Sequence, residues 1–207
     1  TGISLLYLGW AYDELGNCDQ AETLYLESYH IFEKEGNLWA KALAISKLGL
    51  VASSRKDFQL ARRYEEESLD LFAKFGDLSG EAYTNSRLSV VAYYEGNYTE
   101  AVRYGLIGLD RFKELNHSWG VPLSHCRIGF PTLAMGDLRE AENHFFKALS
   151  LVARSQSTLH TLYALGGIAS VWVVDGKYQQ AAEIFGLFLH HPQTPAEYKE
   201  LTEPWHV

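Results

Sequence analysis

The chain has 207 residues, of which 47% are hydrophobic, and its formal net charge is −8. Its longest apolar runs are only a few residues, far below the ~20 that cross a bilayer. An acidic chain also lacks the basic footprint of a general nucleic-acid surface. We therefore expect neither a membrane span nor a nucleic-acid-binding role.

One spacing organises the whole sequence. Alanines recur every 40 residues, and twelve residues before each one stands a small residue that directly follows an apolar one. The five alanines are Ala21, Ala61, Ala101, Ala141 and Ala181. A fixed period of this size is typical of a stacked repeat array, in which each unit buries its apolar face against its neighbours. We expect a single domain over residues 1–207.

Each 40-residue unit predicts a pair of helices, because apolar residues recur at steps of three and four between the seams. Glycine, or Asn116 at one seam, is suited to the left-handed residue that closes a helix. In chain order, helices are predicted at 2–15, 18–35, 38–54, 58–75, 78–95, 98–115, 118–135, 138–154, 158–174 and 178–190. The repeats are 1–36, 37–76, 77–116, 117–156 and 157–193. No segment shows a strand pattern, so the predicted fold class is all-α.

The starts of the helices carry their own signals. Asn or Asp precedes most of them, where its side chain can accept bonds from unpaired N–H groups; Asn97 and Ser157 are expected to act in this way. A short last helix is predicted within 194–204, with Thr194 as its cap and Glu197 completing a capping box.

Several interior residues have expected roles. Charged residues such as Glu65 and Asp70 are assigned to the solvated helix face. Pro131 is expected to kink the helix at 118–135. Gly166 and Gly167 lie inside a helix pattern, where they permit close packing of a neighbouring helix.

The repeat resembles the tetratricopeptide repeat (TPR). The resemblance rests on Leu-Gly in the first helix and on alanine, an aromatic and a small residue in the second. Repeat one shows it at Leu8, Gly9, Tyr12, Ala21, Tyr25 and Ser28. It implies a right-handed α-solenoid of about five helical hairpins with a short C-terminal capping helix. The usual unit has about 34 residues. The longer unit here looks like those of kinesin light chains, bacterial peptide-binding regulators and signal-transducing ATPases.

The segment from Leu71 to Asp77 looks most like the C-terminal sensor arrays of bacterial STAND ATPases and related transcription regulators. That resemblance implies a cytoplasmic protein- or peptide-binding module that senses a ligand or partner for a larger signalling protein. It implies no enzyme activity and no cofactor. The alternatives are a stand-alone scaffold or cargo adaptor, a peptide-pheromone-type receptor, and a repeat-built enzyme.

In the repeat family the first helix of each hairpin lines the concave face. Projecting that geometry places a set of cations and apolar residues there: Tyr7, Trp10, Lys47, Leu50, Arg87, Val90, Tyr94, Arg127 and Phe130. Lys47, Arg87 and Arg127 recur at one position of three consecutive repeats. One hypothesis is that they hold carboxylates or carbonyls of an extended partner segment. The alternative is that they neutralise nearby Glu residues and that Trp10 belongs to the core.

The remaining side chains form no recognisable catalytic, phosphate-binding or metal-binding motif. There is no phosphate-binding loop. The adjacent His190 and His191 cannot both face one metal from a regular helix. We expect His125 to lie in the core or the concave face, and Cys18 and Cys126 to be reduced thiols. No catalytic, cofactor-binding or metal-ligating residue is predicted.

The tryptophans and the first helix have a structural interpretation. Trp39 and Trp119 are equivalent residues near helix starts, and packing against the preceding second helix is favoured over a place on the rim. The helix at 2–15 is apolar on several sides, whereas an end repeat should show a polar outer face. We therefore expect further repeats before Thr1, or a homodimer through this edge.

Overall fold

The structure is a computed structural model that describes residues 1–155 and 157–205, with side chains at 1–152, 157–196 and 198–204. The predicted repeat boundary at residue 156 and the capping side chain of Glu197 lie outside these described parts. The residues group into two compact units, 1–96 and 97–207, each of which is described by itself. The boundary between them follows α5, and the prediction of one continuous domain stays a prediction.

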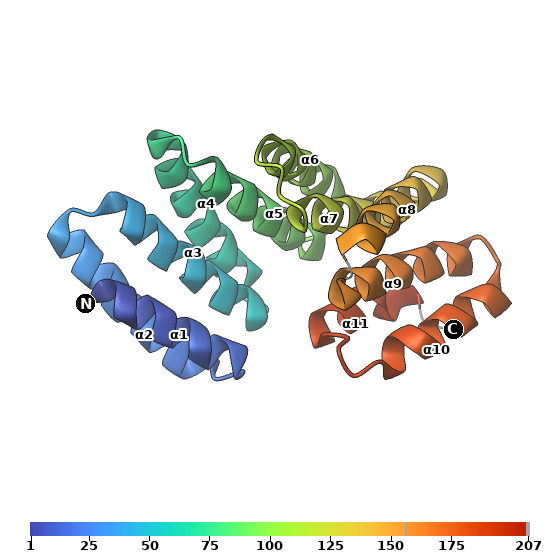
Figure 1. The fold of residues 1–207 in the computed structure, drawn as a ribbon, viewed down its shortest axis with the longest axis horizontal. Coiled ribbons are helices and arrows are strands. Elements are labelled where there is room, and N and C mark those ends of the chain that lie inside the picture. The colour runs from blue at the N-terminus through green and yellow to red at the C-terminus, as the bar shows by residue number, and fades with distance from the viewer. Residues whose placement is uncertain (156, 206–207) are drawn as a thin grey trace. The chain divides into compact units, whose positions relative to one another are not determined.

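The first unit contains five helices, and the second contains six followed by a short 3₁₀ turn at Glu203–Trp205 (Figure 1). Those of the first are α1 (Gly2–Glu14), α2 (Cys18–Glu35), α3 (Leu38–Ser54), α4 (Phe58–Phe75) and α5 (Leu78–Tyr94). Those of the second are α6 (Tyr98–Glu114), α7 (Gly120–Ala134), α8 (Leu138–Ser155), α9 (Thr158–Val174), α10 (Tyr178–His190) and α11 (Ala196–Thr202). No strand occurs in the described residues, and the all-α prediction is confirmed, with the ten long helices ending within two residues of their predicted bounds.

Helix starts follow the predicted capping chemistry in most repeats. The carboxylate or amide oxygens of Asn37, Asp57 and Asp77 accept the backbone N–H three residues later, at 3.1, 3.0 and 2.9 Å. Asn97 and Ser157 make no such bond. The predicted cap at Thr194 is wrong, because its hydroxyl donates instead to the carbonyl of Phe188 at 2.6 Å.

Helix ends place residues in the left-handed region. Six glycines have positive φ there, and Asn116 has φ 50°, as its position at a seam predicts. Lys56 has φ 61° at the turn where the equivalent repeats carry Gly16, Gly96 and Gly136. A side chain in this conformation costs free energy, so the turn between α3 and α4 is strained.

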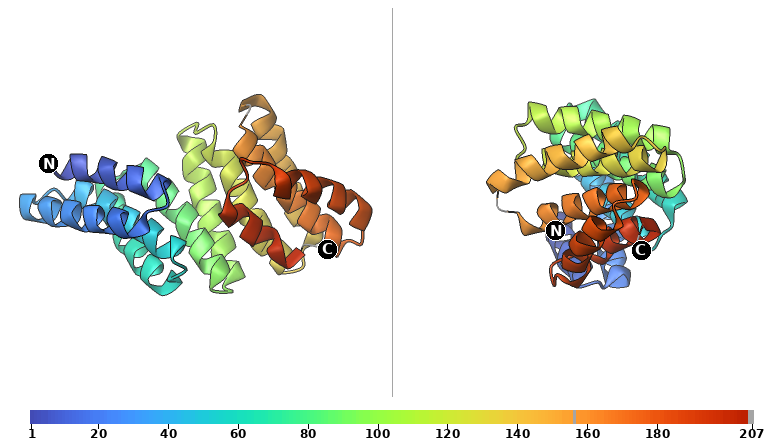
Figure 2. Two further views of the ribbon diagram at one scale, coloured as in Figure 1. Left: turned by 90° about the horizontal axis from the view of Figure 1, so that it is seen from below. Right: turned by 90° about the vertical axis from the view of Figure 1, so that its right-hand side faces the viewer.

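Within each unit, consecutive helices from α1 to α5 and from α6 to α10 pack against one another, and α11 packs against α9 (Figure 2). Glycine permits several of the close crossings. A Cβ on Gly9 of α1 would lie 2.6 Å from the Tyr25 ring of α2. A Cβ on Gly129 of α7 would lie 2.6 Å from the Phe145 ring of α8. The core of each unit therefore forms where a small residue of a first helix receives an aromatic ring of the second.

Two features of the second unit bear on the predictions. Gly166 and Gly167 lie in α9 with neighbouring side chains 2.9 and 2.2 Å from their would-be Cβ atoms, which confirms the close packing expected there. Helix α7 continues through Pro131 as far as Ala134. The kink expected at Pro131 stays a prediction.

Candidate partner-binding surface

The predicted partner-binding residues of the first unit lie on its three first helices. Tyr7 and Trp10 belong to α1, Lys47 and Leu50 to α3, and Arg87, Val90 and Tyr94 to α5. Helix α3 contacts both α1 and α5. The predicted residues of the first unit therefore stand on adjacent helices.

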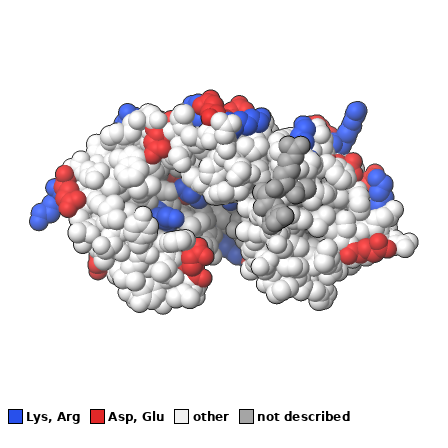
Figure 3. All heavy atoms as spheres, in the orientation of Figure 1, with Lys and Arg blue, Asp and Glu red and all other residues white. Residues whose placement is uncertain are grey.

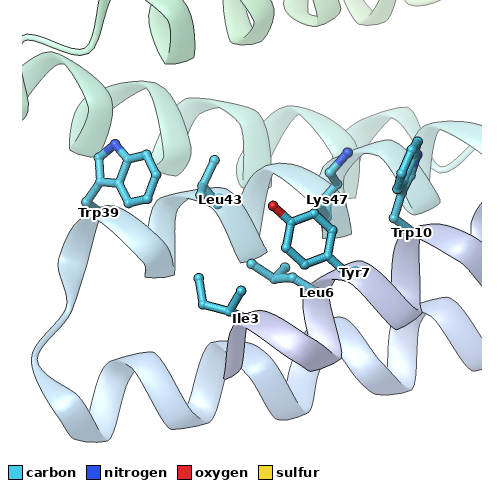
Figure 4. A pocket seen from close by; sticks show the side chains of 7 residues that line it. All are labelled: Ile3, Leu6, Tyr7, Trp10, Trp39, Leu43 and Lys47. Atoms are coloured by element: carbon cyan, nitrogen blue, oxygen red, sulfur yellow. The ribbon is translucent and has the colours of Figure 1, made fainter. Parts of the chain in front are cut away.

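A pocket lies between α1 and α3 and brings three of these residues together (Figure 4). Its volume is about 220 Å³, and its lining residues are Ile3, Leu6, Tyr7, Trp10, Trp39, Leu43 and Lys47. Six of the seven are apolar or aromatic. Lys47 is the charged group of the lining, and Figure 4 shows its side chain beside the ring of Tyr7.

Both tryptophans of the pocket are held by carboxylates. The indole N–H of Trp10 donates to Glu14 Oε1 at 3.0 Å, one turn along α1. The indole N–H of Trp39 donates to Asp77 Oδ2 at 2.7 Å. The ring of Trp39 is 42% exposed and lines the pocket, and its packing against the preceding second helix stays a prediction. The two rings form walls that are oriented before any partner arrives.

The surroundings of Lys47 disfavour its positive charge. Burial, followed by the neighbouring Arg87 guanidinium, lowers the pKa of Lys47, while Asp13 and Glu14 oppose this shift. Burial likewise raises the pKa of Asp13. Among the described residues, the Lys47 ammonium makes no hydrogen bond or ion pair. Lys47 is thus a half-buried cation that faces an apolar pocket.

Arg87 has a different environment, because its guanidinium is bound inside the array. Its Nε donates to Glu65 Oε1 at 2.6 Å, and its Nη2 donates to the hydroxyl of Ser46. The Glu65 side chain is 0% exposed, so its assignment to the solvated face is wrong. Three consecutive helices, α3, α4 and α5, are joined by this network.

The sequence contains the signal for the buried Glu65. Counting in steps of 40 residues places Glu65 at the position of Tyr25, Phe145 and Phe185, while repeat three carries Gly105 there. Its carboxylate also occupies the space of those rings, because a Cβ on Gly49 would lie 2.7 Å from Glu65 Oε1. Repeat alignment could have identified Glu65 as an interior residue, whereas helical periodicity alone could not.

The remaining predicted residues of the first unit have mixed environments. Leu50, Val90 and Tyr94 are half-buried. The Tyr94 ring stacks on Phe58 of α4, with centroids 4.7 Å apart and planes 9° from parallel. One face of this ring is therefore covered by the protein itself.

In the second unit, Arg127 and Phe130 lie on α7. Arg127 is half-buried. Phe130 is 2% exposed and packs against Phe145 and Tyr163, at centroid distances of 4.9 and 5.3 Å. A partner would reach the Phe130 ring only by displacing part of this packing. Trp119 is 37% exposed and lies against Phe112 of the preceding second helix, as expected.

The histidine and cysteine of α7 are both buried. His125 Nδ1 lies 3.0 Å from His144 Nδ1, and His144 Nε2 lies 3.3 Å from Glu140 Oε1. Burial, aided by His144, lowers the pKa of His125 to about 4, and burial raises the pKa of the Cys126 thiol. The imidazole is thus neutral and the thiol protonated at pH 7. No group of three or more His, Cys, Asp or Glu side chains in the described ranges is arranged to hold a metal ion.

Charge on the molecular surface is mixed. Most of the face drawn in Figure 3 is formed by uncharged residues, with basic and acidic side chains interspersed on it. Ion pairs occur in both units, such as the half-buried pair of Arg62 with Glu95 at 2.5 Å and the exposed pair of Lys177 with Asp175 at 2.6 Å. Among the described helices, none is both long enough and apolar enough to cross a bilayer.

Solved structures show which fold this is. The chain matches a Rap protein complexed with Competence and Sporulation Factor over 96% of its length, with a TM-score of 0.78 and 16% identity. It matches a STAND protein with a tetratricopeptide repeat sensor from Pyrococcus horikoshii over 99%, with a TM-score of 0.77 and 16% identity. A third match is BtubC (BKLC) from P. vanneervenii, over 98% of the chain and 81% of that protein, with a TM-score of 0.73 and 15% identity.

The fold is that of tetratricopeptide-repeat proteins. The predicted resemblance in fold to a STAND sensor array is confirmed. The chain spans 54% of the Rap protein and 30% of the STAND protein. No protein-family model and no curated protein sequence matches the chain.

Proposed function

We propose that this chain is a protein- or peptide-binding repeat module, and that it is the ligand- or partner-sensing array of a larger bacterial STAND-type signalling ATPase or transcription regulator in the cytoplasm. One observation carries the binding role. Exposed aromatic residues and a half-buried cation surround a pocket between the first helices α1 and α3. The matches to a STAND sensor and to a Rap protein bound to a factor support the sensing role.

The proposed contact surface of the first unit is Tyr7, Trp10, Lys47, Leu50, Arg87, Val90 and Tyr94. Tyr7 and Trp10 are 68% and 47% exposed, so they supply apolar contact area with little rearrangement. Arg87 contributes through the part of its guanidinium that Glu65 and Ser46 leave free. In the second unit, taken by itself, Arg127 of α7 is a further proposed contact residue, with Phe130 as a buried support for its neighbours.

The test is a pull-down from cells of the source organism with the 207-residue chain as bait. The variant is Tyr7→Ser/Trp10→Ser, and the control is Phe146→Ser on α8, which removes a ring that is 45% exposed elsewhere. We expect one protein or peptide, identified by mass spectrometry, to bind the chain and the control and to be lost with the variant. Equal capture by all three baits contradicts the proposal.

The full reading frame that encodes these residues separates the sensor from its alternatives. A nucleotide-binding or helix-turn-helix domain in the same protein supports the sensor. A reading frame limited to repeats supports a scaffold, a cargo adaptor or a peptide-pheromone-type receptor. Turnover of hydrolase substrates by the purified chain, abolished by substitution of a polar residue in the pocket, would support the repeat-built enzyme.

We also propose that α1 supports a homodimer. Ile3 and Leu8 of this helix are 45% and 47% exposed, and Leu15, just after its end, is 80% exposed, more apolar area than an end repeat normally shows to water. Light scattering at rising concentration should show mass doubling, and Leu8→Glu should abolish it. A constant monomer mass overturns this part of the proposal without affecting partner binding.

A further inference from the structure

The pocket between α1 and α3 has the size of a site for one side chain. Its volume of about 220 Å³ lies below the ~300–1,000 Å³ of sites that enclose a whole small molecule. The walls are apolar, with Ile3, Leu6 and Leu43 between the two tryptophan rings. An apolar group of a few carbon atoms fills this volume with favourable burial of its surface.

The walls are held in place without an occupant. Each tryptophan ring keeps its orientation through its own carboxylate partner, Glu14 for Trp10 and Asp77 for Trp39. A preformed site loses little side-chain entropy when it is filled. The pocket is therefore suited to an occupant that enters as a ready-made apolar body.

Two polar groups stand at this pocket with unused hydrogen-bonding capacity. Within the described part of the chain, neither the Lys47 ammonium nor the Tyr7 hydroxyl makes a hydrogen bond. Both groups can donate, and Lys47 carries a charge that its surroundings disfavour. A carboxylate at this place accepts from both and compensates the charge.

Arg87 shows why this role falls to Lys47. The two cations are equivalent residues of successive repeats, 40 positions apart. Arg87 is neutralised by the buried Glu65, whereas no carboxylate of the described residues pairs with Lys47. An ion pair formed away from water is stronger than one on the surface. A partner's carboxylate therefore gains more binding free energy at Lys47 than at Arg87, which already pairs with Glu65.

Building on the proposed function, we propose that this pocket takes one apolar side chain of an extended partner segment, and that the carboxylate of an adjacent Asp or Glu in that segment binds Lys47 and Tyr7. The recognised motif is an apolar residue next to an acidic residue, and it lies in the interior of the partner chain rather than at its C-terminus. The pocket thereby selects both the partner and the register in which it binds.

The probe is a phage-displayed library of random twelve-residue peptides, flanked on both sides by constant sequence so that no free terminus is offered. It is selected against the full 207-residue chain. The enriched peptide is then synthesised with blocked termini, together with its variant in which the acidic residue is replaced by the amide. We expect the enriched sequences to share an apolar–acidic pair.

Affinities are measured by calorimetry with three forms of the chain. Lys47→Met removes the charge and keeps most of the apolar stem. Lys34→Met, an exposed lysine of α2 outside the pocket, is the matched control. We expect Lys47→Met to weaken binding about tenfold or more and Lys34→Met to leave it unchanged, since a hydrogen-bonded charge contributes at least that factor.

A double-mutant cycle tests the contact directly. If the acidic residue binds Lys47, the amide peptide binds the Lys47→Met chain as well as the acidic peptide does. Additive losses, or enriched peptides without an acidic residue, overturn the inference while the chain remains a peptide-binding module. Binding that requires a free C-terminal carboxylate also overturns it. Failure to enrich any peptide, with the pull-down positive, overturns the inference alone; failure of both overturns the proposed function as well.

Discussion

Glu65 stands where repeats one, four and five carry the rings of Tyr25, Phe145 and Phe185. A carboxylate survives at this buried position because Arg87 reaches it from the next repeat, at 2.6 Å. Removing one partner of a buried ion pair leaves the other uncompensated, which costs more than the pair contributes. The network thus makes the folding of two successive repeats depend on each other.

We expect Glu65→Ala to lower the free energy of unfolding by about 3 kcal/mol, because Arg87 loses its compensating charge and a cavity forms. Glu65→Phe/Arg87→Leu, which introduces the aromatic found in repeats one, four and five, should recover at least half of that loss. Urea denaturation followed by circular dichroism measures both. A double variant as unstable as Glu65→Ala would show that repeat two does not tolerate the common pattern.

Lys56 lies in the turn between α3 and α4 with φ 61°, a left-handed conformation that is unfavourable for a residue other than glycine. Glycine adopts this conformation without a steric penalty. We expect Lys56→Gly to raise the free energy of unfolding by about 0.5–1 kcal/mol. The same change at Lys34, inside α2, serves as the control and should lower stability by about 1 kcal/mol. A destabilising effect at Lys56 would contradict the strain in this turn.

At the scale of the helix, glycine has two roles that a sequence pattern alone cannot separate. Gly167 of α9 has the Phe145 ring 2.2 Å from its would-be Cβ, whereas Gly186 of α10 has nothing within 4 Å. Alanine is the better helix former at an open position. At a crowded position the methyl group must push the neighbouring ring aside.

We therefore expect opposite effects from the same substitution. Gly167→Ala should destabilise the protein by about 1–3 kcal/mol, and Gly186→Ala should stabilise it by about 0.5–1 kcal/mol. Thermal unfolding of both variants, monitored at 222 nm in one buffer, makes the comparison. A rise of the unfolding temperature in both variants would mean that the higher helix propensity of alanine outweighs the crowding against the Phe145 ring.

The sequence predicts elements well, because each seam repeats the same local signals. Gly36 or Gly76 closes a helix and Asn37 or Asp77 opens the next, and all four act as expected. The site was less predictable, because it depends on contacts between repeats. The bond from Trp39 to Asp77 joins residues 38 positions apart, and the pairing of Arg87 with Glu65 requires knowing which helices adjoin. Periodicity places a residue on a face but does not identify its partner.

For the molecule as a whole, the buried histidines determine the response to acid. The folded pKa of His125 is about 4, below the ordinary value of 6.5, and burial also lowers those of His144 and His160. Because these pKa values are depressed in the folded state, protonation favours the unfolded chain. The contribution of His125 to stability is complete above pH 6.5 and is lost as pH falls towards 4, and those of His144 and His160 are likewise lost as pH falls below 6.5.

We expect the free energy of unfolding to fall between pH 7 and pH 5, by up to about 1.4 kcal/mol per pH unit for each histidine within its window. Denaturant titrations at pH 7, 6 and 5 measure the slope. His125→Gln should reduce it, and His30→Gln, at an exposed residue of α2, should not. Stability that is constant over this range would contradict the burial of the His125–His144 pair.

The carboxylate of Asp77 serves two structures at once. One oxygen caps the start of α5 through the N–H of Gly80, and the other holds the indole of Trp39 at the rim of the pocket. Any occupant that turns this indole must break the second bond. It would then remove the bond that joins α3 to the N-terminus of α5. An occupant that leaves the indole in place leaves both bonds of Asp77 intact, so only a movement of Trp39 would connect the pocket to the start of α5.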